Sequence, residues 1–85
     1  MQVIENVQTP MVTDMKVRLK DILMIVSWRE LSKRYFGKSS SWLYHKMDGI
    51  SGNGTAGGFT AKEAEDMKTA LIDLSNRIRI AAESI

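Results

Sequence analysis

The stretch of the sequence richest in chemically reactive side chains covers residues 36–49 and reads FGKSSSWLYHKMDG. Its Gly37-Lys38-Ser39 matches the end of a phosphate-binding loop. The full motif also needs a glycine five residues before Gly37, where Ser32 stands, and a strand in front of it. The sequence therefore does not predict a nucleotide hydrolase.

The same stretch holds the only histidine of the chain, His45, close to several serines and to Asp48. A catalytic triad needs a base bonded to the nucleophile and an acid that orients the base, and neighbours on one short helix do not build that geometry. One histidine and no cysteine also leave a metal ion without a set of ligands. We expect no enzyme activity, no metal site and no cofactor.

The composition is that of an ordinary globular domain. The chain has 85 residues, which is one domain by length, with 44% hydrophobic and 26% charged residues. The absence of cysteine excludes a disulfide framework and a zinc finger and fits a reducing compartment. No apolar run reaches the length of a membrane span. These features predict a soluble cytoplasmic protein without a membrane partner.

The charge is distributed unevenly along the chain. The formal net charge is only +2, but residues 28–47 contain one acidic residue, Glu30, against five basic ones. These are Arg29, Lys33, Arg34, Lys38 and Lys46. A local basic patch attracts polyanions even when the whole protein is nearly neutral. The alternative is a solvated surface without a partner.

Helical periodicity and capping signals predict four helices. Thr9-Pro10 suits a helix start, and apolar residues then recur at spacings of three and four, which predicts a helix over about 10–24. Ser27 and Glu30 form a capping box for a second helix over 28–35. Ser39 or Ser40 caps a third helix over 40–47, whose Leu43 and Met47 face the core.

A glycine-rich segment and a long helix complete the chain. Residues 48–59 contain Asn53-Gly54, a favoured turn pair, and predict a loop or a small two-stranded wing. A second capping box, from Thr60 to Glu63, begins a helix over 61–84. Its apolar seam consists of Ala64, Met67, Leu71, Leu74, Ile78, Ala81 and Ile85. This seam either packs on the first helix or pairs with a second copy in a homodimer.

The two central helices and their glycine turn form a predicted helix-turn-helix, whose second helix enters the major groove of DNA. With Leu43 facing inward, the residues predicted to approach bases are Ser40, Ser41, Tyr44 and His45. The residues predicted to bind phosphates are Arg29, Lys33, Arg34 and Lys38. Aromatic side chains on a short helix also serve as core or interface anchors. The predicted interface residues are Trp42, Met67, Leu71, Leu74 and Ile78.

The run LSKRYFGKSSSWLYHKMDG resembles the Cro/repressor-like helix-turn-helix family of phage and bacterial regulators. In that family a glycine turn precedes the recognition helix, which ends in a glycine twelve residues later, as at Gly37 and Gly49. The family's small residue on the preceding helix would fall at Lys33, so Ser32 is one place off and predicts a turn longer by one residue. From Val26 onward the chain is also similar to a small bacterial family of unknown function with FGKS, SWLY and a glycine-rich turn before FT.

Together these patterns predict an all-α domain of four helices, over residues 1–85, with a long C-terminal helix packed on or near the first. The resemblance to the Cro/repressor-like family implies a small DNA-binding transcriptional regulator that acts as a dimer on double-stranded DNA. The alternative is a protein–protein interaction and oligomerisation module that does not bind DNA.

Overall fold

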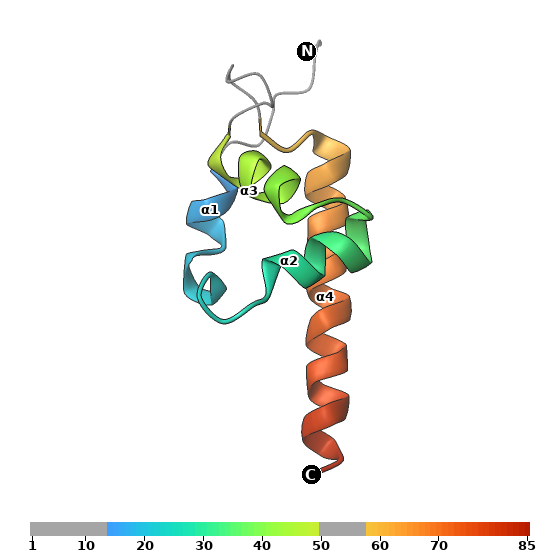
Figure 1. Cartoon of the computed structure of the whole chain (residues 1–85). Helices are drawn as coiled ribbons and strands as arrows, with labels where there is room; N and C mark the ends of the chain where they lie inside the picture. Colours follow the sequence, from blue (N-terminus) through green and yellow to red (C-terminus); the bar gives the residue numbers. More distant parts are fainter. Residues whose placement is uncertain (1–13, 50–57) are drawn as a thin grey trace, which may run out of the picture.

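The computed structural model describes residues 14–49 and 58–85, and within them every regular element is helical (Figure 1). The elements in order are α1 (Met15–Arg18), the 3-10 helix η2 (Lys20–Ile22), α2 (Trp28–Leu31), the π-helix η3 (Ser32–Phe36), α3 (Ser40–Asp48) and α4 (Ala61–Glu83). The described residues contain no β-strand. The predicted all-α fold with a long C-terminal helix is therefore confirmed. The expected helix start at Thr9-Pro10 and most of the glycine-rich segment, with its Asn53-Gly54 turn, lie outside the described residues.

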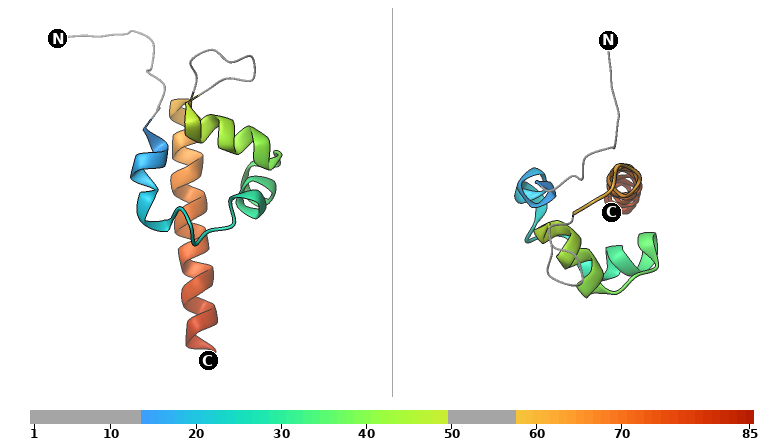
Figure 2. Two further views of the ribbon diagram at one scale, coloured as in Figure 1. Left: turned by 60° about the vertical axis from the view of Figure 1, so that its left-hand side comes forward. Right: turned by 90° about the horizontal axis from the view of Figure 1, so that it is seen from above.

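The core lies where α1, the α2–α3 pair and the first half of α4 meet, as the view from above shows (Figure 2). Both short central helices and the two outer ones contribute to it. Its buried apolar side chains are Met15, Leu19, Trp28, Leu31, Leu43, Met47, Phe59, Met67 and Ala70. Ser32 is the one buried polar side chain found among the described residues.

The prediction of a continuous first helix to residue 24 is wrong, although its apolar face is placed correctly. Met15 and Leu19 are buried as the periodicity required, but α1 ends at Arg18 and gives way to a 3-10 turn. The indole N–H of Trp28 donates to the carbonyl oxygen of Leu23 at 2.8 Å. A continued helix would have used that carbonyl for the amide of Ser27, so the tertiary contact replaces the helical one.

The sequence predicted a turn that is longer by one residue. In the structure the extra residue belongs to the helix before the turn. Ser27 caps α2 through its side chain, and the last turn of the helix is a π segment, which holds one residue more than an α-turn. Gly37 then adopts a left-handed conformation with φ of 64°, and three residues later α3 begins. The turn itself is therefore short, and Ser32 still lies beneath it.

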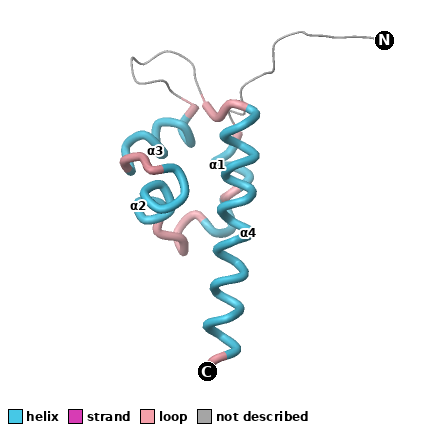
Figure 3. Tube along the Cα trace, turned by 90° about the vertical axis from the view of Figure 1, so that its right-hand side faces the viewer, coloured by secondary structure: helices cyan, strands magenta, loops and turns pink. Residues whose placement is uncertain are grey.

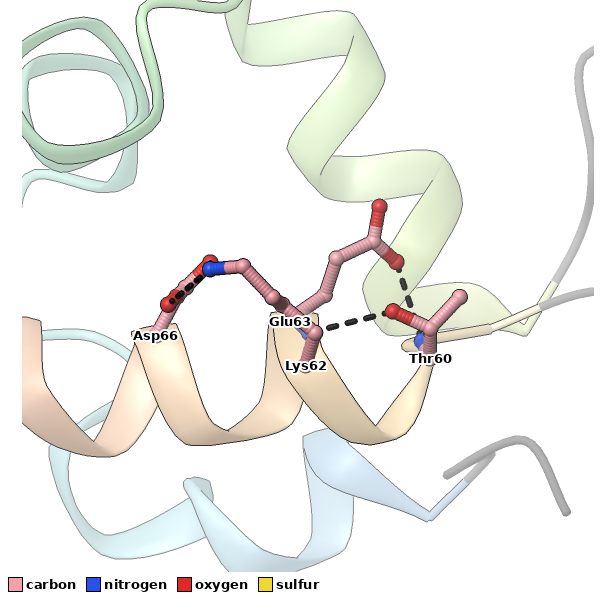
Figure 4. A network of polar contacts seen from close by, with 4 residues as sticks. All are labelled: Thr60, Lys62, Glu63 and Asp66. Atoms are coloured by element: carbon pink, nitrogen blue, oxygen red, sulfur yellow. Dashed lines mark hydrogen bonds and ion pairs between the residues drawn. The ribbon is translucent and has the colours of Figure 1, made fainter. Parts of the chain in front are cut away.

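The N-terminal end of the long helix α4 is linked to α3 through a capping residue. Thr60 and Glu63 form a reciprocal capping box: the Thr60 hydroxyl accepts from the Glu63 amide at 3.1 Å, and the Glu63 carboxylate accepts from the Thr60 amide at 2.9 Å (Figure 4). The Lys46 ammonium of α3 lies 2.9 Å from the same carboxylate. One side chain thus serves both as a helix cap and as a link between two helices.

This double role predicts a stability contribution that depends on pH. Burial opposes ionisation of Glu63, but the Thr60 amide and the Lys46 ammonium outweigh it and hold the pKa of Glu63 below its usual value of 4.5. The stabilisation is therefore complete above about pH 4.5 and is lost as the pH falls through the lowered pKa of the folded state. Glu63→Gln should cost about 0.5–1 kcal/mol at pH 7 and less near pH 3, since glutamine keeps the capping hydrogen bond but not the charge.

Urea denaturation of Glu63→Gln and the unchanged protein at the two pH values measures this difference. The control is Glu65→Gln, an exposed position on the same helix, which should change stability little at either pH. A cost for Glu63→Gln that is the same at both values would contradict the assignment.

Candidate nucleic-acid interface

The helix α3 turns one face inward and leaves the opposite face open to solvent. Leu43 and Met47 are buried, four residues apart on one side of the helix. Ser41 and His45 are exposed, and the Tyr44 side chain is 46% exposed. Of the four residues predicted to approach bases, Ser40 alone is half-buried, because it belongs to the first turn of α3, beside the preceding turn.

A surface cleft with a volume of about 350 Å³ lies at the N-terminus of α3. We call it the basic cleft; it is lined by Arg29, Lys33, Lys38, Ser39 and Ser40. Arg29 and Lys33 are four residues apart and share one face of the preceding helix, while Lys38 follows the left-handed glycine of the turn. The short turn thus brings three of the four predicted phosphate-binding residues to the start of α3.

The fourth predicted phosphate-binding residue, Arg34, lies elsewhere. Its guanidinium contacts the carboxylate of Glu30 at 3.4 Å, and it lines a different cleft, which faces α4. One residue further along a helix means a rotation of about 100°, which is enough to turn Arg34 away from Lys33. The sequence grouped these residues by charge, and the helix separates them.

The electrostatics of the basic cleft favour an anion. No acidic residue lines it, and none of its three cationic side chains takes part in an ion pair within the described part of the chain. Ser39 caps α3 with its hydroxyl oxygen, which accepts from the amide of Trp42 at 3.2 Å. The positive end of the α3 dipole therefore adds to the charge of the side chains.

At the C-terminal end of α3, in contrast, acidic residues neutralise the basic side chains. The Lys16 ammonium of α1 lies 3.0 Å from the carboxylate of Asp48, and Lys46 is paired with Glu63 of α4. Both contacts hold the C-terminal half of α3 against the outer helices. Among the described residues of this region, the positive charge that no acid neutralises is thus concentrated at the N-terminal end of α3.

Trp42, which the sequence grouped with the interface residues, packs within its own chain. Its ring centroid lies 5.2 Å from that of Phe36, and the side chain is half-buried against the core. The ammonium groups of Lys38 and Lys46 lie 5.9 and 5.7 Å from the Trp42 ring centroid, within the range of a cation–π interaction. Trp42 therefore contacts Lys38, one of the residues that line the basic cleft.

The predicted interface residues of α4 fall into two groups. Met67 is 1% exposed and belongs to the core, and Leu71 and Leu74 are partly buried against it. Ile78, one helical turn further, is 59% exposed. The seam of α4 thus packs inside the chain over its first half only.

Two residues that hold this region together were missed from the sequence. The Ser32 hydroxyl donates to the Ser39 carbonyl at 2.8 Å and approaches the Lys38 carbonyl at 3.2 Å, so it ties the turn to the helix before it. The Tyr35 hydroxyl donates to Asp73 of α4 at 2.6 Å, which raises the pKa of Tyr35. The one signal in the sequence was Ser32 itself, a small polar residue close to the glycine turn. It was used to predict the length of the turn and not a hydrogen bond across it.

Within the described residues no group of histidine and acidic side chains is arranged to hold a metal ion, and no helix there is long and apolar enough to cross a membrane. No curated protein is significantly similar to the chain, and no solved structure matches it. The similarity to the Cro/repressor-like proteins therefore stays a prediction. A family profile, however, matches residues 15–85, which include every helix described above. The chain accordingly belongs to the family described as a domain of unknown function, DUF5053.

Proposed function

We propose that this domain binds double-stranded DNA, with α3 in the major groove and the basic cleft on the phosphate backbone. The observation that carries the proposal is the basic cleft itself, where Arg29, Lys33 and Lys38 meet the N-terminus of a helix and no acidic residue is part of the lining. A DNA phosphate suits that combination, because cationic side chains and helix N-termini both bind phosphate oxygens.

The arrangement around the cleft supports the same mode of binding. A helix that ends at residue 36, a turn with a left-handed glycine and the nine-residue α3 follow one another as in a helix-turn-helix. Gly49, which also has a positive φ, ends α3 where the Cro/repressor-like pattern has its glycine. The π segment supports the comparison, since it explains why Ser32 is one residue out of place.

In this mode the exposed face of α3 approaches the base edges. Ser41 and His45 offer hydrogen-bonding groups, and Tyr44 offers an apolar ring with a hydroxyl that suits a thymine methyl or a phosphate. The N-terminal end of α3 adjoins the basic cleft. In helix-turn-helix proteins, phosphate contacts beside the recognition helix likewise fix the position of that helix. The cleft then supplies affinity, and the face of α3 supplies whatever sequence preference the protein has.

The experiment compares DNA binding by the unchanged protein and by a triple variant, Arg29→Gln, Lys33→Gln, Lys38→Gln, by fluorescence anisotropy on mixed-sequence duplexes. Between about 50 and about 200 mM salt, the affinity of the unchanged protein should fall steeply. The triple variant should bind much more weakly at low salt, and its slope of log affinity against log salt should be smaller by about 3, one for each phosphate that the variant no longer neutralises.

The control removes the same amount of charge elsewhere: Lys20→Gln, Lys68→Gln, Arg79→Gln, all at exposed positions away from the basic cleft. It should retain most of the affinity and the slope. Equal losses in the two triple variants would show that binding depends on net charge alone. The absence of binding by the unchanged protein at low salt would overturn the proposal in favour of a module that does not bind DNA.

A further inference from the structure

A second cleft, which the proposed DNA binding does not use, lies between the helix before the glycine turn and α4. The helix formed by α2 and η3 lies beside the middle of α4, and η3 contacts it (Figures 1 and 3). The cleft has a volume of about 390 Å³, within the range of about 300–1,000 Å³ that is usual for sites that bind small molecules. We call it the α2–α4 cleft.

The lining of the α2–α4 cleft combines apolar and cationic side chains. Its apolar part consists of Val26, Leu31 and Leu74, of which Leu31 is buried and the other two are half-buried. Arg34 of η3 and Arg77 of α4 also line it, so the two walls contribute one cation each. Small-molecule sites commonly have this composition, with apolar surface and a few polar groups that fix the orientation of the ligand.

Both guanidinium groups are oriented by a carboxylate and have further N–H donors available. The Nε of Arg34 donates to Glu30 at 3.4 Å, and the Nε of Arg77 donates to Asp73 at 2.8 Å. A guanidinium has five N–H donors, four of them on its two Nη atoms. Within the described residues the Nη groups of these two arginines donate no hydrogen bond. They are therefore available for a ligand, and a carboxylate matches their planar geometry with two parallel hydrogen bonds.

Tyr35 further fixes the position of Arg77. The Tyr35 hydroxyl donates at 2.6 Å to the same Asp73 oxygen that accepts from Arg77. These two donors hold the pKa of Asp73 below its usual value, so Asp73 stays ionised and keeps its contact with Arg77. Tyr35 itself lines the cleft and links its two walls. A cation that is held in place in this way loses less conformational freedom when a ligand binds.

We propose that the α2–α4 cleft binds a small carboxylate that carries an apolar group. The Nη groups of Arg34 and Arg77 bind the carboxylate, and the apolar group lies against Val26, Leu31 and Leu74. This site is separate from the basic cleft, and its ligand is of a different class.

The charge of the lining favours this class of ligand. Two arginines and one acidic residue, Glu30, give the lining a net charge of +1. A ligand with one negative charge balances it, whereas a doubly charged phosphate would also be repelled by Glu30 and by Asp73 beside Arg77. The basic cleft has neither acidic nor apolar residues in its lining, so it suits a phosphate. The two clefts are therefore expected to bind different ligands.

The test is a titration with phenylacetate, followed by the NMR shifts of the backbone amides. The shifts should be largest around the α2–α4 cleft. The dissociation constant should be on the order of 1 mM, which is usual for a ligand of about ten non-hydrogen atoms. Phenylacetamide keeps the ring and loses the charge, and acetate keeps the charge and loses the ring. Each should bind about tenfold more weakly, since each lacks one of the two contacts.

A pair of double variants tests the role of the arginines. Arg34→Gln, Arg77→Gln should weaken phenylacetate binding about tenfold or more. The matched control is Arg29→Gln, Arg79→Gln, which removes the same charge from the same two helices at exposed residues that do not line the cleft. It should leave the affinity unchanged. Exposed ion pairs contribute little to stability, so both variants should keep their helical circular dichroism.

The absence of shifts at the α2–α4 cleft up to about 20 mM phenylacetate would overturn the proposal. Equal losses in the two double variants, or equal binding of phenylacetamide, would contradict the assigned role of the arginines and overturn it as well. Largest shifts at the basic cleft would show that the ligand binds there through positive charge alone. The titration contains no DNA and the control variant alters Arg29 of the basic cleft, so its outcome is independent of the proposed DNA binding.

Discussion

Phe59→Ala is expected to lower the free energy of unfolding by about 3–5 kcal/mol, which is the usual cost of removing a buried phenylalanine. Phe59 is the largest side chain with no exposed surface among the described residues. It lies directly before the capping residue of α4, where an apolar side chain fixes the angle at which the chain enters the helix. Its loss therefore opens a cavity and also loosens the placement of α4.

Such a cost is a large part of the total stability of a small domain, which is typically about 5–15 kcal/mol. Urea denaturation followed by circular dichroism gives the value. The control is Tyr44→Ala, which removes an aromatic ring of similar size from the half-exposed face of α3 and should change stability by about 0.5 kcal/mol or less. A cost for Phe59→Ala no larger than that of the control would show that the core is not centred on Phe59.

The local signals in the sequence predicted the places where helices begin. Ser27 caps α2 through its side chain, the capping box at Thr60 begins α4, and the left-handed glycine at Gly37 ends a helix. These signals act over three or four residues, so the sequence alone contains all the information they need. The apolar periodicity likewise predicted that Leu43 and Met47 face inward.

The features that the sequence did not predict depend on contacts between distant residues. The first helix breaks where the Trp28 indole takes the Leu23 carbonyl, and periodicity reports which side chains face the core but not how the backbone is hydrogen-bonded. Likewise, the seam of α4 looks uniform in the sequence. It is buried at Met67 and exposed at Ile78, because the short elements before it cover only its first half.

Only part of the candidate site was predicted from the sequence, because the rest depends on how the helices fold. Arg29, Lys33 and Lys38 were grouped by their charge, and the fold does bring them together at the N-terminus of α3. Arg34 was grouped with them and faces α4 instead. Charge density along the chain locates a basic region, but the rotation of each residue around its helix decides which cleft it lines.

Ser32 connects the stability of the domain to the geometry of the basic cleft. Its carbonyl oxygen accepts from the amides of Gly37 and Lys38, and its hydroxyl donates to the carbonyl of Ser39 at 2.8 Å. The backbone carbonyl and the side-chain hydroxyl of Ser32 therefore both stabilise the turn. Because Ser39 caps α3 and lines the basic cleft, the position of the cleft depends on a side chain that cannot itself touch a ligand.

Ser32→Ala is expected to lower the free energy of unfolding by about 0.5–1.5 kcal/mol, since it removes the hydroxyl that donates to the Ser39 carbonyl and approaches the Lys38 carbonyl. Denaturant unfolding measures this loss. On the proposed function, the variant should also bind DNA more weakly while it is fully folded, because Lys38 and the first turn of α3 are no longer held in one position.

The control for that second effect is Thr60→Ala, which removes the cap of α4 and should cost about 1 kcal/mol of stability without disturbing the basic cleft. Anisotropy titrations under conditions where both variants are folded should show weaker binding for Ser32→Ala and unchanged binding for Thr60→Ala. Equal affinities would mean that the turn does not position the cleft, even if Ser32 stabilises the fold. A residue buried beneath the turn then contributes to stability alone, and the cationic side chains bind DNA without being held in place.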